Sequence, residues 1–210
     1  FGRAIVNTMK VGSGAEIINI SANQIFGYNS LTTNTGNYNI AIGTEVLMAQ
    51  TSGERNTGVG YQAGRSNVTG DYNSWFGFSA GRGATNQSNS NNTGIGYESM
   101  YSVTTANGST GLGHQSLRAL TSGGSNTGVG NSAAYSVTTG VENTALGQTA
   151  LFYNVTGNYN VAIGRASMYG VSGNSHENNT AVGYKSLFGI TTGDDNVALG
   201  IYSLREGTTL

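Results

Sequence analysis

The chain of 210 residues contains no proline and no cysteine, and only 9% of its residues are charged. Without cysteine, a disulfide framework and a zinc-thiolate site are both excluded. Nine Lys and Arg against ten Asp and Glu give a net charge of −1. The chain therefore lacks the surplus of positive charge that binding to nucleic acid or to an anionic membrane surface requires.

Long apolar runs are also missing. No run approaches the ~18 to 20 residues of a membrane span, and the start, Phe1-Gly2-Arg3-Ala4, resembles neither a signal peptide nor a transit peptide. No membrane insertion is expected. Glycine is abundant, with 34 residues against roughly 15 in an average chain of this length. It does not recur at every third position, so a collagen-like structure is excluded.

A repeat of about 17 residues organises this glycine. Each copy reads Asn, then Thr, Val, Ile or Ser, then usually Ala or Gly, then an aliphatic residue or Phe, then Gly, as in Asn179-Thr180-Ala181-Val182-Gly183. The closing glycines are spaced by 17 residues, apart from one step of 16 and two of 19, and are Gly27, Gly43, Gly60, Gly77, Gly96, Gly113, Gly130, Gly147, Gly164, Gly183 and Gly200. The pattern predicts an all-β, repetitive β-solenoid (a β-helix-like fibre) of about eleven coils over residues 23–210. Residues 1–22 are predicted to form a lead-in strand or cap, with the strand at 15–21.

Alternation within each copy places the Thr/Val and aliphatic positions on one strand face, and Asn and Ala/Gly on the other. Because Val161, Val197 and Ile40 replace Thr, we expect the Thr/aliphatic face to be buried. The small Ala/Gly position predicts that another backbone or a partner chain comes close on the opposite face. The asparagines are expected to form a structural ladder of stacked amides, with members Asn39, Asn56, Asn73, Asn92, Asn126, Asn143, Asn160, Asn179 and Asn196.

A second apolar segment follows each glycine by three and four residues, as at Ser186-Leu187, and several coils then carry Tyr or Phe. Its spacing fits either a short strand or one helical turn. The two 19-residue steps lie 87 positions apart, and Asn67-Val68-Thr69 matches Asn154-Val155-Thr156 at the same offset. We infer a five-coil super-repeat.

Catalysis needs converging titratable groups, and the chain has few. His114 and His176 lie in different coils and are expected at the surface. Asp194 and Asp195, with Glu206, are the nearest approach to an acid pair, but a turn is their simpler role. Serine recurs at one repeat position, whereas a nucleophile would be singular. No catalytic residue, metal site or cofactor is predicted, and the chain is not expected to be an enzyme.

Aromatic side chains recur directly after the repeat glycine. Two interpretations remain open: the rings stack on sugars of a host glycan, or they cover the turn and lock neighbouring coils. The candidate contacts to a glycan or protein receptor are Tyr28, Tyr61, Phe78, Tyr97, His114 and Tyr184.

The repeats, for example residues 56–64 and 179–188, resemble those of bacteriophage tail fibres, in particular fibres with a C-terminal intramolecular chaperone of the endosialidase type. The resemblance spans about residues 23–204 and carries no chaperone segment. More distantly, the Asn-x-Ala-Ile-Gly motif is similar to head repeats of trimeric autotransporter adhesins, whose coil is shorter. Both resemblances imply a homotrimer on a virion or outside a cell.

The expected function is that of a structural and adhesive fibre segment, such as a phage tail fibre, which displays turn residues to a host receptor. A bacterial surface adhesin or a self-assembling extracellular filament is the alternative, and a polysaccharide-degrading tailspike is the third. Because residues 204–210 stop short of another coil, we expect the array to be capped, continued or met end on by another copy.

Overall fold

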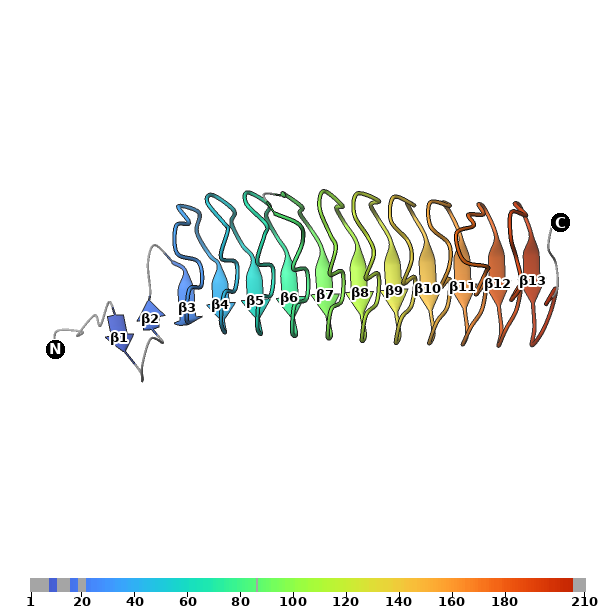
Figure 1. Cartoon of the computed structure of the whole chain (residues 1–210), viewed down its shortest axis with the longest axis horizontal. Coiled ribbons are helices and arrows are strands. Elements are labelled where there is room, and N and C mark those ends of the chain that lie inside the picture. Colours follow the sequence, from blue (N-terminus) through green and yellow to red (C-terminus); the bar gives the residue numbers. More distant parts are fainter. Residues whose placement is uncertain (1–7, 11–15, 19–21, 86, 206–210) are drawn as a thin grey trace.

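The computed structural model describes residues 8–10, 16–18, 22–85 and 87–205, and in these it contains thirteen β-strands in one sheet, ordered as in the chain (Figure 1). Strands β1 (Thr8–Lys10) and β2 (Glu16–Ile18) are antiparallel to each other, and β2 is antiparallel to β3 (Gln24–Gly27). From β3 onward each strand pairs in parallel with the next.

One strand of three residues occurs in each later coil. These strands are β4 (Ile40–Ile42), β5 (Thr57–Val59), β6 (Ser74–Phe76), β7 (Thr93–Ile95), β8 (Thr110–Leu112), β9 (Thr127–Val129), β10 (Thr144–Leu146), β11 (Val161–Ile163), β12 (Thr180–Val182) and β13 (Val197–Leu199). Equivalent repeat positions lie side by side, as Ala145 does beside Ala162. The predicted all-β solenoid is thereby confirmed, with eleven parallel strands and about ten turns.

Both ends of the sequence reach beyond the described residues. Strand β2 falls within the predicted lead-in strand at 15–21, of which only residues 16–18 are described. Residues 206–210, which belong to the last partial repeat, lie outside the described part.

The strands face the opposite way from our expectation. The Ala/Gly position is buried, with Ala145 at 0% exposure, whereas Leu112 and Leu146 on the other face are 43% and 46% exposed. The interior is so narrow that a Cβ added to Gly58 would lie 2.4 Å from Cγ1 of Val46. The prediction of a buried Thr/aliphatic face is wrong, and the close neighbour of the small residue is a side chain of the same chain.

The second segment forms the opposite wall and takes neither of the two forms considered. Its buried leucines have left-handed backbone conformations, with φ of 48° at Leu47 and 49° at Leu117. Coil-to-coil hydrogen bonds continue there, as from N of Leu47 to O of Ala63 at 3.0 Å. Each left-handed residue costs roughly 1 to 2 kcal/mol, so this wall depends on burying its side chains and pairing its backbone.

The closing glycines, apart from Gly200 in the last coil, lie where successive coils approach each other closely. Gly60 has φ of 130°, and a Cβ there would lie 2.4 Å from the carbonyl O of Gly77 in the next coil. No other residue fits without moving the backbone. Close stacking of the coils therefore explains a large part of the glycine content.

The interior of one coil is packed differently from the others. Trp75 stands at the small position of β6 and is 0% exposed. The second-wall positions beside it are Gly64 and Gly81, where added Cβ atoms would lie 2.6 and 2.2 Å from the indole ring. The indole therefore fills the space that leucine or methionine side chains occupy in most other coils.

This exchange of volume predicts that larger side chains at the two second-wall positions can compensate for the loss of Trp75. Trp75→Gly should lower the free energy of unfolding by about 3 to 5 kcal/mol, because it leaves a large cavity. Adding Gly64→Leu and Gly81→Met should recover most of the loss, since these positions already have the backbone conformation of Leu47. Urea denaturation provides the measurement. A triple variant no more stable than Trp75→Gly would contradict the packing described.

Candidate functional site

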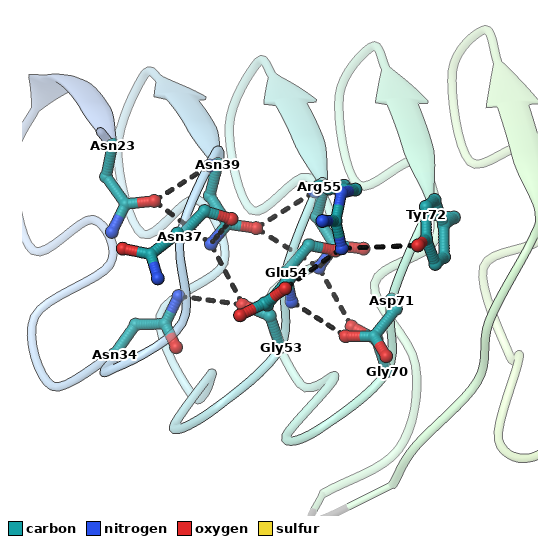
Figure 2. Close-up of polar contacts among 11 residues, drawn as sticks. Asn23, Asn34, Asn37, Asn39, Gly53, Glu54, Arg55, Gly70, Asp71 and Tyr72 are labelled. Carbon is teal, nitrogen blue, oxygen red and sulfur yellow. Dashed lines mark hydrogen bonds and ion pairs between the residues drawn. The ribbon is translucent and has the colours of Figure 1, made fainter. Parts of the chain in front are cut away.

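A ladder of buried asparagine side chains runs through the solenoid (Figure 2). Oδ1 of Asn39 accepts hydrogen bonds from the backbone N of Asn56 at 2.9 Å and from its Nδ2 at 3.2 Å. Nδ2 of Asn39 donates to the carbonyl O of Gly53, in the turn that leads to the next strand, at 2.9 Å. Each rung thus holds together two consecutive strand entries and the turn between them.

The same arrangement recurs along the array. At Asn143, Oδ1 accepts from N and Nδ2 of Asn160 at 3.1 and 2.9 Å, and Nδ2 donates to O of Gly157 at 2.9 Å. Ser109 is the one rung without an amide: its Oγ accepts from N of Asn126 at 3.1 Å. The nine asparagines predicted as a ladder lie in this single column, and Asn23 begins it.

The recurring serine is also engaged inside the coil. Oγ of Ser99 donates to O of Gly111 at 2.9 Å, and Oγ of Ser186 donates to O of Ala198 at 2.9 Å. Both serines are 0% exposed. Their hydroxyls have a structural role, which leaves them out of reach of a dissolved substrate.

The two 19-residue coils share one hydrogen-bond pattern. Oδ1 of Asn67 accepts from N of Gly70 at 3.2 Å, and Oδ1 of Asn154 accepts from N of Gly157 at 3.2 Å. Thr69 with Ser88, and Thr156 with Ser175, make matching contacts at 2.8 Å between hydroxyls. The inferred super-repeat therefore has a structural counterpart. Asn67 and Asn154, although within Asn-x-Thr sequences, are buried.

His176 is buried in the second of these coils, 1% exposed, so its predicted surface position is wrong; His114 is exposed. The longer coil folds His176 inward, at the repeat position of Asn89. Its Nδ1 lies 3.4 Å from Oδ1 of Asn160, and its Nε2 has no partner. Burial lowers the pKa of His176 to about 4, although the carboxylate of Asp194 acts in the opposite direction.

The aromatic residues after the repeat glycine mostly stack on one another. Ring centroids are 5.1 Å apart for Tyr61 and Phe78, 5.4 Å for Phe78 and Tyr97, and 5.2 Å for Tyr97 and His114. Tyr28, 52% exposed, lies at the N-terminal end of this column, and Tyr184 meets Tyr202 edge-on at 5.3 Å near the other end. From Tyr61 to His114, neighbouring rings cover one another's faces, so a ligand would meet mainly the ring edges.

A second aromatic column, five residues after the repeat glycine, was not among our candidates. Tyr135, Phe152, Tyr169 and Phe188 stack at centroid distances of 5.0 to 5.2 Å. Arg118 extends the stack, because its guanidinium lies 5.8 Å from the centre of the Tyr135 ring. The sequence shows that these rings recur at a fixed offset from the glycine. That they stack continuously could be predicted only once the coils were known to align.

Three of the six arginines in the described array are neutralised locally. Arg65 pairs with Glu45 at 2.9 Å, Arg118 with Glu98 at 2.8 Å and Arg55 with Glu54 at 2.9 Å. Hydrogen bonds from Gln62 and Arg65 hold the pKa of Glu45 below its ordinary value.

Asp194, in the acid pair considered above, contacts the backbone of the preceding coil. Oδ1 of Asp194 accepts from the backbone N of Glu177 at 2.7 Å, which fits a turn role for the Asp194–Asp195 sequence. Within the described ranges no group of three or more His, Asp or Glu side chains could hold a metal ion. The described part also contains no helix long and apolar enough to cross a membrane.

Comparisons with known proteins identify no relative. No protein-family model, curated protein or solved structure matches the chain.

The ladder predicts opposite effects for two matched substitutions. Asn143→Ser should lower the free energy of unfolding by roughly 1 to 3 kcal/mol, because it removes the two hydrogen bonds that Nδ2 donates to the carbonyl O of Gly157 and to Oδ1 of Asn126. Ser109→Asn should raise it by about 1 kcal/mol, because the new amide completes the column. Urea unfolding of both variants tests this. An unchanged midpoint for Asn143→Ser would show that the ladder is not stabilising.

His176 predicts acid sensitivity. Its pKa in the folded chain, about 4, lies below the ordinary value of 6.5. As the pH is lowered, this histidine is therefore protonated in the unfolded chain before it is protonated in the folded chain. Stability is fully present above pH 6.5 and falls toward pH 4, by at most about 1.4 kcal/mol per pH unit. His176→Asn, which copies Asn89, should flatten the slope of unfolding free energy against pH in this window. A slope that His176→Asn leaves unchanged would show that His176 is not the group that makes folding sensitive to acid.

Proposed function

We propose that this chain is a segment of a structural and adhesive extracellular fibre, such as a phage tail fibre, in which three copies associate through their strand faces. The observation that carries the proposal is the outward face of the parallel sheet. Two side chains of every strand from β3 to β13 point outward, and none of them is charged.

The outward aliphatic column is exposed or half-buried along the array. Ile42 is 41% exposed, Ile95 38% and Leu146 46%, and Thr, Val or Ser side chains lie beside them in nearly every coil. If each outward position exposes on the order of 50 Å², the face totals roughly 1,000 Å², whereas the largest apolar patch of a monomer is usually about 300 to 600 Å². This area also exceeds the ~800 Å² that one partner contributes to a standard interface.

The shape of this face favours association along the fibre axis. Each strand contributes only two outward side chains, so the face is a narrow ridge about 7 Å wide that extends over eleven strands. Narrow ridges can converge around a common axis, as the resemblance to trimeric fibres implies. Copies with the same coil spacing would place equivalent residues opposite each other in every coil.

The remaining surfaces support display instead of chemistry. Buried asparagine and serine side chains are engaged in holding the coils together, and the exposed turn residues differ from coil to coil. A rigid shaft with variable turn residues is suited to contacting a host glycan or protein receptor. We therefore propose an adhesive role outside the cell or on a virion, without catalysis.

If three copies associate through their strand faces, negative charges placed on these faces should prevent the association. The double variant Leu112→Glu/Leu146→Glu should convert the trimer to a monomer, because six carboxylates would be buried around one axis. Thr139→Glu, at an exposed turn residue, is the control and should keep the trimer. Light scattering coupled to size-exclusion chromatography gives the mass of each variant.

The same measurement decides between assemblies. A discrete trimer that the double variant disrupts supports the fibre proposal. A monomeric wild-type chain would overturn it, and open-ended polymers would favour the filament alternative. Release of reducing ends from a host polysaccharide would instead identify a tailspike enzyme.

A further inference from the structure

Two cations near the C-terminal end of the array differ from most of the others. Arg165 follows the closing glycine of its coil and is exposed, and Lys185 lies in the next coil and is half-buried. Neither has a carboxylate within 4.0 Å among the described residues, whereas Arg55, Arg65 and Arg118 are each paired with a glutamate. Their positive charge is therefore available to a ligand.

Both cations lie close to the same aromatic ring. The guanidinium of Arg165 and the ammonium of Lys185 each lie 5.5 Å from the centre of the Tyr184 ring. Tyr202, 45% exposed, meets Tyr184 edge-on at 5.3 Å, and the guanidinium of Arg205 lies 5.1 Å from the Tyr202 ring. Two tyrosines and at least two cations thus lie in the segments that follow β11, β12 and β13, three strands that are neighbours in the sheet (Figure 1).

The electrostatics of Tyr184 agree with this geometry. A hydrogen bond with Tyr202 and the positive charges of Lys185 and Arg165 place the pKa of Tyr184 below its ordinary value. The acidic residues Asp194 and Asp195 precede β13, whereas the cluster follows the strand ends. A strand of three residues, about 10 Å long, separates these carboxylates from the cluster.

We propose that Arg165, Lys185, Tyr184 and Tyr202 form a binding site for an acidic sugar, that is, a glycan that carries carboxylate or sulfate groups. The cations attract and hydrogen-bond the anionic group, and the phenol hydroxyls and ring edges contact the hydroxyls and C–H groups of the sugar. Neutral glycans lack the group that the two cations recognise. The inference deepens the proposed adhesive function and rests on it.

Binding to defined polymers tests the site. We expect the whole chain to bind polygalacturonate, dextran sulfate or both, with an affinity that falls several-fold when NaCl is raised from about 50 to about 300 mM, and to leave neutral dextran unbound. Carboxylate and sulfate ligands are distinguished by which of the two polymers binds more tightly. Biolayer interferometry on immobilised protein gives the dissociation constants.

Variants separate the site from general charge effects. Arg165→Gln/Lys185→Gln should weaken binding about tenfold or more, because both charge-assisted contacts to the anionic group are lost. Arg55→Gln is the matched control, because Arg55 also lies 5.5 and 5.3 Å from two tyrosine rings but is paired with Glu54. It should change affinity less than twofold, and melting temperatures should show that both variants fold.

Three results would overturn the inference: no binding of either acidic polymer, equal binding by the wild type and the double variant, or tighter binding of single-stranded DNA than of both polymers. The mass of the same samples is measured in parallel. If the chain is a trimer that binds neither acidic polymer, only the acidic-sugar site is overturned. If the chain is a monomer, the proposed fibre is overturned.

Discussion

Every other feature of this fold depends on the distance between successive coils. The asparagine ladder holds that distance together with the pairing of the parallel strands, because each side-chain oxygen accepts from the next coil while its amide nitrogen holds the turn, as Asn39 does with Asn56 and Gly53. At this spacing the coils come so close that Gly60 has no room for a Cβ beside Gly77. A single coil could not offset its own ordering cost of roughly 1 to 2 kcal/mol per residue. Cooperation between neighbouring coils is therefore a condition of folding.

The sequence predicted the periodic part of this structure well. Spacing of the closing glycines indicated the solenoid, and the asparagines indicated a ladder along it. The orientation of the strands was predicted wrongly, because mixing of Thr with Val was taken as a sign of burial. What decides the orientation is the width of the interior: leucines such as Leu47 already fill it from the opposite wall, so from β4 to β13 only Ala, Gly or a compensated Trp75 lies inward.

Other features could not be derived from the period. Positive φ at Leu47 or Leu117 contradicts the usual preference of leucine, and it arises from tertiary packing and coil-to-coil bonds. His176 was expected at the surface because a metal or acid–base site would need partner side chains from other coils, yet the two additional residues of its coil carry it inward. The second aromatic column and its extension by Arg118 follow from the alignment of the coils, because residues 17 or 19 positions apart in the sequence become neighbours.

The central claim is that the asparagine ladder holds each coil to the next, and residue-resolved hydrogen exchange on the intact chain tests it directly. In the structure the backbone N of Asn143 donates to Oδ1 of Asn126 at 3.0 Å, immediately before the strand begins. The account predicts that this amide exchanges as slowly as the amides inside β10, because both open only when coils separate. Exchange of the Asn143 amide at the rate of the exposed turn amides would contradict the account.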